Sequence, residues 1–402
     1  MRRVAITGAG TINALGRNVP ETLAAMADGR SAIGPLELRD LDRLQIRIGA
    51  QIRDYRPEDH FGARDLAMLD RFAQFALIAA DEAMRSAGLQ VDESLVPRAG
   101  VILGTAGGGV ETSDDSYRAV YQQGRNRAHP FTIPRLMANA AASHVGMRFG
   151  LRGPTMTIST ACSSANHAMG LAFQMIRCGM ADVVLTGGAE AMLTFGGLKA
   201  WEGLRVMSPD GCRPFSASRN GMVMGEGAAV FVFEAWEHAV RRRAVILAEI
   251  AGFGMTADAA DLVMPSQQGA EQAIRAALLD ARLAPEAVGY VNAHGTGTSA
   301  NDRIECAALR AALGNQADSV MVSSTKAMHG HVMGATGAVE LLACILALRD
   351  GVIAPTVNFD RPDPECDLDV VPNAARQARI DAALSNSFAF GGLNAVLALK
   401  RA

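Results

Sequence analysis

A single cysteine stands among small and hydroxylated residues in ISTACSSANHAMG, residues 158–170. Ala, Met, Leu and Phe follow Cys162 at helical spacing, which predicts that the thiol lies at the start of a helix. Free N–H groups and the positive dipole end of such a start stabilise a thiolate and lower the pKa of the thiol. The N–H of Cys162 itself would be one oxyanion donor. These features indicate a nucleophile, and a packed core cysteine is the alternative.

Two further segments carry chemistry-bearing side chains. His294 follows a predicted strand and precedes Gly-Thr-Gly-Thr, a loop that lets a substrate come close, although a structural histidine is the alternative. SSTKAMHGH places Lys326, His329 and His331 beside hydroxyl groups at a strand end. The H-x-H pair lacks further ligands at zinc spacing, so we expect no metal.

Two glycine-rich segments are weaker candidates. GAGTINALG has Asn13 where the third glycine of a dinucleotide fingerprint belongs, which argues against NAD binding. NSFAFGGLNA lacks the Lys-Ser/Thr of a phosphate loop. It is either a plain turn or a mobile loop that borders a site.

Strands and helices that alternate along the chain would position these residues. RVAITGAG predicts a buried strand that runs into a glycine turn, and DRFAQFALIAADEAMRSAGL predicts a helix that ends at Gly88. The strand, Ser/Thr-rich turn and helix around Cys162 have an echo in VMVSSTKAMHGHVMGATGAVELLACILALRDGVI. The pattern indicates a layered α/β protein with two similar halves.

Composition excludes several function classes. The 402 residues carry 38 basic and 41 acidic side chains, a net charge of −3, so neither nucleic acid nor a membrane surface is an expected partner. The six cysteines are scattered, which favours a reducing compartment. MRRVAITGAG enters the first predicted strand without an apolar signal region, so we expect a cytoplasmic protein.

The motifs STACSS, NAHGTGT, SSTKAMHGH and NSFAFGGLN together resemble the β-ketoacyl-acyl carrier protein synthases of the synthase II type. HGTGTSAND, LKAWEGLRVMSPDGCRPFS and FAFGGLNAVLAL are most similar to the nodulation-type and polyketide-type members. The resemblance implies the thiolase-like α/β fold, with duplicated βα halves in five α-β-α-β-α layers. The halves would be residues 1–245, with the dimer interface, and 246–402.

The resemblance also implies a role for each matching residue. Cys162 would accept an acyl group from an acyl carrier protein, and malonyl carrier would then condense with it in a decarboxylative Claisen reaction without a cofactor. His294, His331 and Lys326 match the other catalytic residues, and Glu340 matches the acidic neighbour of the lysine. Phe390 matches a gate whose N–H joins that of Cys162 in the oxyanion hole. His329 has no such role, so we expect it in a structural or rim position, and we expect His167 to be a satisfied interior histidine.

Departures from the family pattern bear on the substrate. Gly107 stands where relatives often place a bulky aliphatic residue, which predicts long, unsaturated or polyketide-like acyl chains. The expected pocket residues are Gly107, Phe195, Ala389, Gly391 and Gly392. Ala389 and Leu393 also replace a common Gly and Thr of the gate loop. Arg64 and Arg205 are expected to dock the carrier, while Ala67 and Met68 replace basic residues and favour a dedicated carrier.

Other assignments follow from the same family. The favoured one is an elongating enzyme that works as a homodimer, and the nearest alternative is the catalytic subunit of a heterodimer with a chain-length factor. A thiolase or an acyl-CoA-initiating synthase uses a different set of residues. A non-catalytic chain-length factor lacks the nucleophile, whereas Cys162 and both histidines are present here.

Overall fold

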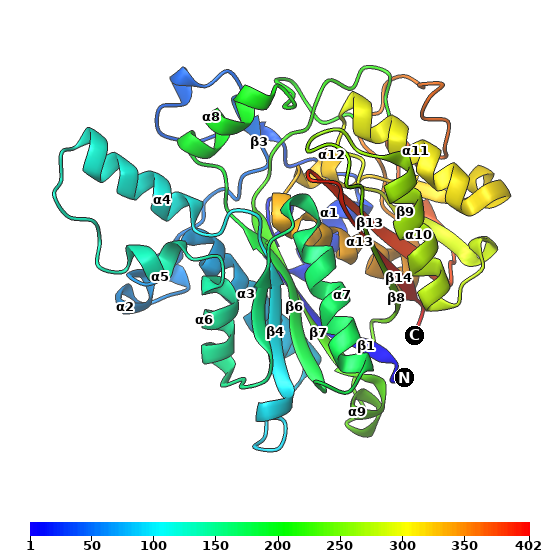
Figure 1. The fold of residues 1–402 in the computed structure, drawn as a ribbon, viewed down its shortest axis with the longest axis horizontal. Helices are drawn as coiled ribbons and strands as arrows, with labels where there is room; N and C mark the ends of the chain where they lie inside the picture. The colour runs from blue at the N-terminus through cyan, green and yellow to red at the C-terminus, as the bar shows by residue number, and fades with distance from the viewer.

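The computed structural model describes residues 1–402, built around ten strands in the order β10-β9-β13-β14-β8-β1-β7-β6-β4-β5 (Figure 1). The first five strands are β1 (Val4–Asn13), β4 (Ala99–Gly104), β5 (Thr155–Ile158), β6 (Val183–Glu190) and β7 (Gly227–Ala235). The last five are β8 (Ala248–Ala257), β9 (Val288–Asn292), β10 (Met321–Ser323), β13 (Ala382–Ala389) and β14 (Leu393–Lys400). Only three residue pairs between β1 and β8 join the two sets.

The two sets of five strands have the same topology. From the junction outward the orders are β1-β7-β6-β4-β5 and β8-β14-β13-β9-β10, so each strand has a counterpart in the other half. β4 is parallel to β5 and β6, as β9 is to β10 and β13, and the remaining neighbours are antiparallel in both. The duplication predicted from the sequence echo is confirmed. The predicted division at 245/246 lies between α9 (Trp236–Arg241) and β8.

Three hydrophobic clusters make the layers. The largest contains α7 (Ser164–Arg177) and α13 (Thr336–Asp350), which lie between the two sets of strands. The outer clusters contain α3 (Arg71–Ala87) with α6 (Ala140–Phe149), and α10 (Gln267–Ala281) with α11 (Ser299–Leu313). Strand residues alternate between clusters, since Val184 packs in the central one and its neighbours Val183 and Leu185 in an outer one. Figure 1 shows the five layers from α3 and α6 on the left to α10 and α11 on the right.

The remaining elements connect or cover these layers. They are α1 (Val19–Ala27), α2 (Ala63–Leu66), α4 (Val110–Tyr117), α5 (Thr132–Leu136), α8 (Phe195–Leu204), α12 (Lys326–His329), β2 (Gly34–Pro35), β3 (Ile48–Gly49), β11 (Val352–Ile353) and β12 (Arg376–Gln377). No helix of the chain is both long enough and apolar enough to cross a membrane.

The first glycine-rich segment is strand, not the predicted turn. β1 continues through Gly8 and Gly10 to Asn13, with a shift in register after Ile6. A Cβ at Gly8 would lie 2.3 Å from the carbonyl oxygen of Ala83, and one at Gly10 would lie 2.0 Å from that of Ala79. These glycines therefore serve the close packing of α3 on β1. The predicted helix end is confirmed, because Gly88 ends α3 with φ 56°.

Candidate active site

Cys162 lies in a tight turn between β5 and α7, as the sequence predicts. A 3₁₀ turn spans Ala161–Ser163, and α7 begins at Ser164. Ala161 has φ 49°, in the left-handed region that an alanine adopts at a cost. The strained residue directs the next side chain away from the path of the strand. The thiol is buried, with 8% of Cys162 exposed.

The pKa of this thiol differs from the prediction. Burial raises the pKa of Cys162 to about 11, whereas a lowered pKa was expected from the helix start alone. The charge of Lys326 and the backbone N–H groups of Phe390 and Cys162 act in the opposite direction. Desolvation by segments distant in sequence is the larger effect, so the resting nucleophile is a thiol. The two N–H groups that face the sulfur are the pair that the family resemblance implies.

Cys162, His294 and His331 line one cavity of about 160 Å³. His294 follows β9, and His331 follows α12 through Gly330, whose φ is 66°. The two imidazoles meet edge to face, with ring centroids 5.5 Å apart and an angle of 85°. The sequence separates these three residues widely, and the two halves of the fold bring them together.

Both histidines are neutral in this environment. Burial, followed by the positive charge of Lys326, lowers the pKa of each well below its usual range. The N–H of Met333 donates to Nδ1 of His331 over 3.0 Å, so the ring proton of His331 sits on Nε2. That Nε2 is buried and has no partner in the protein. His331 therefore presents a free N–H donor.

Lys326 and Glu340 form an ion pair with both side chains fully buried. Burial raises the pKa of Glu340 to about 7, and the lysine acts against that rise. Glu340 belongs to α13 and Lys326 to α12, so the pair ties the segment that carries His331 to the central helix. It also places the positive charge that adds to burial in lowering the pKa of both imidazoles.

Two buried carboxylates that the sequence reasoning missed hold the loops of the site. Glu305 accepts from the backbone N–H groups of His294, at 2.8 Å, and Gly295, at 2.7 Å. Glu190 accepts from the N–H groups of Gly107, at 3.1 Å, and Gly334, at 2.9 Å, and so links the two halves. An acidic residue on the buried stripe of a helix, or at the end of a buried strand, is the signal that could have found them.

The glycine-rich segment near the C-terminus is the turn between β13 and β14. Ala389 and Phe390 line the cavity, and Phe390 stacks on Trp201 with ring centroids 5.9 Å apart. Gly391 (φ 84°) and Gly392 (φ 67°) shape the turn and do not line the cavity. Only glycine adopts two such conformations in succession without strain.

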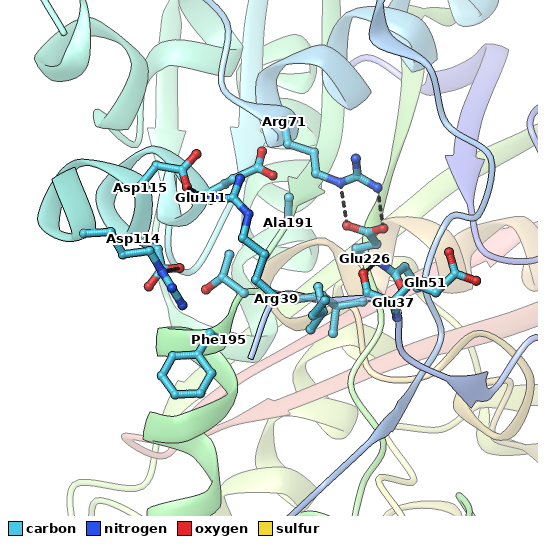
Figure 2. Close-up of a pocket in the computed structure, with 14 residues that line it drawn as sticks. Glu37, Arg39, Gln51, Arg71, Glu111, Asp114, Asp115, Ala191, Phe195 and Glu226 are labelled. Atoms are coloured by element: carbon cyan, nitrogen blue, oxygen red, sulfur yellow. Dashed lines mark hydrogen bonds and ion pairs between the residues drawn. The ribbon is translucent and has the colours of Figure 1, made fainter. Parts of the chain in front are cut away.

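Two further predicted pocket residues, in addition to Gly391 and Gly392, lie outside the cavity. Gly107 is exposed, and a Cβ there would meet the side chains of Met192 and Val110 at 2.7 Å. Phe195 borders a second, polar cavity of about 250 Å³, where Arg71 pairs with Glu226 (Figure 2). The guanidinium of Arg43 lies 4.6 Å from the Phe195 ring centroid.

The docking arginines and the other histidines also have clear positions. Arg64 lies on α2 and Arg205 ends α8, both exposed, and these elements stand apart in Figure 1. His329 is buried, with its ring nitrogens against the carbonyl of Gly330 and the hydroxyl of Thr325. Nδ1 of His167 lies 3.0 Å from the Thr160 hydroxyl. The interior position predicted for His167 is confirmed, and His329 is also interior rather than at the rim.

Comparison with known proteins identifies the class to which this fold and site belong. The family model described as the N-terminal domain of β-ketoacyl synthase matches residues 1–239, and the C-terminal domain model matches residues 247–360. The chain belongs to the β-ketoacyl synthase family, whose members are condensing enzymes of the acyltransferase type. The thiolase-like fold and the ketosynthase activity predicted from the motifs are confirmed.

Individual relatives span the whole chain. Nodulation protein E of Rhizobium sp. (strain N33) is 50% identical over 400 residues, covering 100% of this chain and 99% of the relative. The 3-oxoacyl-[acyl-carrier-protein] synthase 2 of Coxiella burnetii is 40% identical over 408 residues, covering 100% and 99%. The solved structure of the ishigamide ketosynthase/chain length factor matches with a TM-score of 0.95 and 34% identity, covering 100% and 99%.

Proposed function

We propose that this chain is an elongating β-ketoacyl-acyl carrier protein synthase in which Cys162, His294, His331 and Lys326 carry the reaction. The observation that carries the proposal is the single cavity that holds a buried thiol and two neutral imidazoles, one with its Nε2–H free. Acyl carrier protein is the proposed partner, because relatives of this identity act on substrates carried by it, as their names state.

The first step transfers the acyl group. The Cys162 sulfur attacks the carbonyl of the carrier thioester, a carbon–sulfur bond forms to Cys162, and the bond to the carrier thiol breaks. The thiol proton leaves with the carrier sulfur. The N–H groups of Cys162 and Phe390, which face the sulfur, stabilise the oxyanion of the tetrahedral intermediate.

The second step forms the new carbon–carbon bond. Malonyl carrier loses carbon dioxide, and negative charge develops on its thioester oxygen. Neutral imidazoles of His331 and His294 donate hydrogen bonds to that oxygen, and the Nε2–H of His331 is available because it has no partner in the protein. The resulting carbanion attacks the acyl-Cys162 carbonyl and releases the thiolate. Lys326 supports the rings through its charge, and Glu340 holds Lys326.

Chain length, docking and assembly belong to the same proposal. A small residue at 107 favours long, unsaturated or polyketide-like chains, although Gly107 lies outside the cavity of the unacylated enzyme. The test is turnover against chain length for the wild type and Gly107→Ile, and an unchanged profile would contradict this part.

Arg64 and Arg205 are the proposed docking residues. A homodimer is favoured, with a chain-length-factor heterodimer as the alternative that the ishigamide structure supports. The cytoplasm is the proposed location, since it keeps a catalytic thiol reduced.

Mass spectrometry of the Cys162 peptide tests the core of the proposal. Incubation with an acyl carrier thioester is expected to add the mass of the acyl group in the wild type and not in Cys162→Ala. Cys178→Ala is the matched control, because Cys178 is exposed at the opposite end of α7. A wild type that remains unmodified, or an adduct that persists in Cys162→Ala, would contradict the assignment.

A further inference from the structure

Trp201 is a cavity residue to which the reaction assigns no task. It lies on α8 and lines the same cavity as Cys162 and Phe390. Its indole stacks on the phenyl ring of Phe390, with centroids 5.9 Å apart and ring planes 23° from parallel. A stacked pair in this range is an attractive contact beyond the burial of its area.

Hydrogen bonds fix the position of α8, the helix that carries Trp201. Glu202, the next residue, accepts from the backbone N–H groups of Gln45, at 2.6 Å, and Ile46, at 2.9 Å. Lys199 donates to the carbonyl of Arg43 over 2.7 Å. The helix that carries the indole is therefore fastened on one side to the segment 43–46.

Phe390 lies in the turn between β13 and β14. It belongs to a three-residue turn in which the next two residues are glycines with positive φ. Hydrogen bonds connect its glycines to neighbouring segments: Gly391 N–H donates to the carbonyl of Leu262 at 2.7 Å, and Asp258 N–H donates to the carbonyl of Gly392 at 2.9 Å. The turn is held through its glycines, and the stack on Trp201 adds a contact through the side chain of Phe390.

The ring of Phe390 and its backbone N–H belong to one residue, so a contact that positions the ring also restrains the N–H. Its N–H faces the Cys162 sulfur and favours the thiolate. Contact between the rings therefore also fixes the position of that N–H relative to the sulfur. Cys162, Trp201 and Phe390 line the same cavity, so a long acyl chain on Cys162 that passes between the two rings has to part them.

We propose that Trp201 is a positioning and specificity-determining residue. Through the stack it holds the Phe390 N–H over Cys162, and it opposes the entry of long acyl chains by keeping the rings together. This inference rests on the proposed function, since it requires an acyl group on Cys162.

Substitution separates the two effects. Trp201→Ala removes the stack, so turnover of a short hexanoyl substrate falls by about 2- to 10-fold, the factor that one aromatic pair is worth. The ratio of hexadecanoyl to hexanoyl turnover rises in the same variant. Trp201→Phe keeps an aromatic ring, so its hexanoyl turnover and its ratio of hexadecanoyl to hexanoyl turnover should both be close to those of the wild type. If the alanine variant folds poorly, Trp201→Leu takes its place, because leucine supplies an apolar side chain without a ring.

Fluorescence gives a readout that does not depend on rate. The chain has two tryptophans, and Trp236 lies on α9 against Arg3, so Trp236→Phe leaves Trp201 as the single emitter. The emission of this variant is expected to shift when hexadecanoyl carrier acylates Cys162. In the double variant that also carries Cys162→Ala, the same substrate should leave the emission unchanged.

The outcomes are distinguishable. An acyl adduct confirmed by mass together with unchanged Trp201 emission would overturn the inference alone, as would a Trp201→Ala enzyme with the wild-type chain-length ratio. Absence of any adduct in the wild type would overturn the proposed function and the inference with it.

Discussion

Burial and charge act against each other on the Cys162 sulfur. Burial prevails and raises the pKa of the thiol to about 11, although Lys326 and two N–H groups favour the thiolate. The consequence is a cysteine that is largely protonated until substrate arrives. Protection from adventitious alkylation and oxidation follows, because the thiolate is the reactive form.

The pH dependence of alkylation tests this balance. Below the pKa the thiolate fraction rises about tenfold per pH unit, so modification of Cys162 by iodoacetamide should accelerate from pH 7 to 9 without a plateau. Lys326→Met should slow it at every pH, because the charge that favours the thiolate is gone. Quenched-flow labelling followed by peptide mass spectrometry measures both, and a plateau near neutral pH would show that the helix start dominates instead.

Glu305 offers a second test at the scale of one residue. Glu305→Ala leaves the buried N–H groups of His294 and Gly295 without an acceptor. A loss of about 1–3 kcal/mol in the positioning of His294 is expected, which corresponds to a decarboxylation step slower by roughly 5- to 150-fold. Acylation of Cys162 should change less, because its donors are elsewhere.

Release of carbon dioxide from malonyl carrier and acylation of Cys162 are measured separately for this purpose. Glu271→Gln is the matched control, since Glu271 pairs with Arg275 at the surface of α10. Equal losses in both steps would mean that Glu305 has only a structural role.

At the scale of elements, the central helices are packed too closely for an added methyl group. A Cβ at Gly337 of α13 would lie 2.2 Å from Oδ1 of Asn166 on α7. Gly337→Ala is expected to lower the free energy of unfolding by about 1–3 kcal/mol through overpacking. Urea denaturation measures it.

Gly203 in α8 provides the control for that substitution. A Cβ at Gly203 meets nothing within 4 Å, so Gly203→Ala should leave stability unchanged or raise it by up to about 1 kcal/mol. A Gly337→Ala protein as stable as the wild type would mean that α7 and α13 can move apart, which the shared cluster of buried residues opposes.

At the scale of the whole molecule, the α4–α5 region exposes large apolar side chains. Tyr121 is 80% exposed and Ile133 is 63% exposed. The edge strand β5 has one free side at the end of the sheet. Exposed apolar patches and open edges are typical of interaction surfaces, which supports the proposed dimer.

Sedimentation velocity tests the dimer. Tyr121→Asp with Ile133→Asp should weaken association by at least about 30-fold, the effect of losing a central contact. Leu279→Asp, at an 81% exposed position on α10, should have no effect. A wild type that sediments as a monomer without any partner chain would favour the heterodimer alternative.

Much of the site could be predicted from the sequence because its signals are local. The type and spacing of residues around Cys162, His294, Lys326 and His331 carry the family pattern within short segments. The presence of two similar halves was also predicted, because the same succession of strand, Ser/Thr-rich turn and helix occurs twice. What depends on contiguous residues was determined by the sequence itself.

Only the tertiary structure decided which groups share a cavity and in which protonation state. It raised the pKa of Cys162 that the helix start alone would lower, and it fixed the proton of His331 on Nε2. It placed Gly107 and Phe195 outside the cavity and brought Trp201 against Phe390. Desolvation and side-chain contact depend on segments far apart in the chain, so motifs identify the reacting groups and packing sets their chemistry.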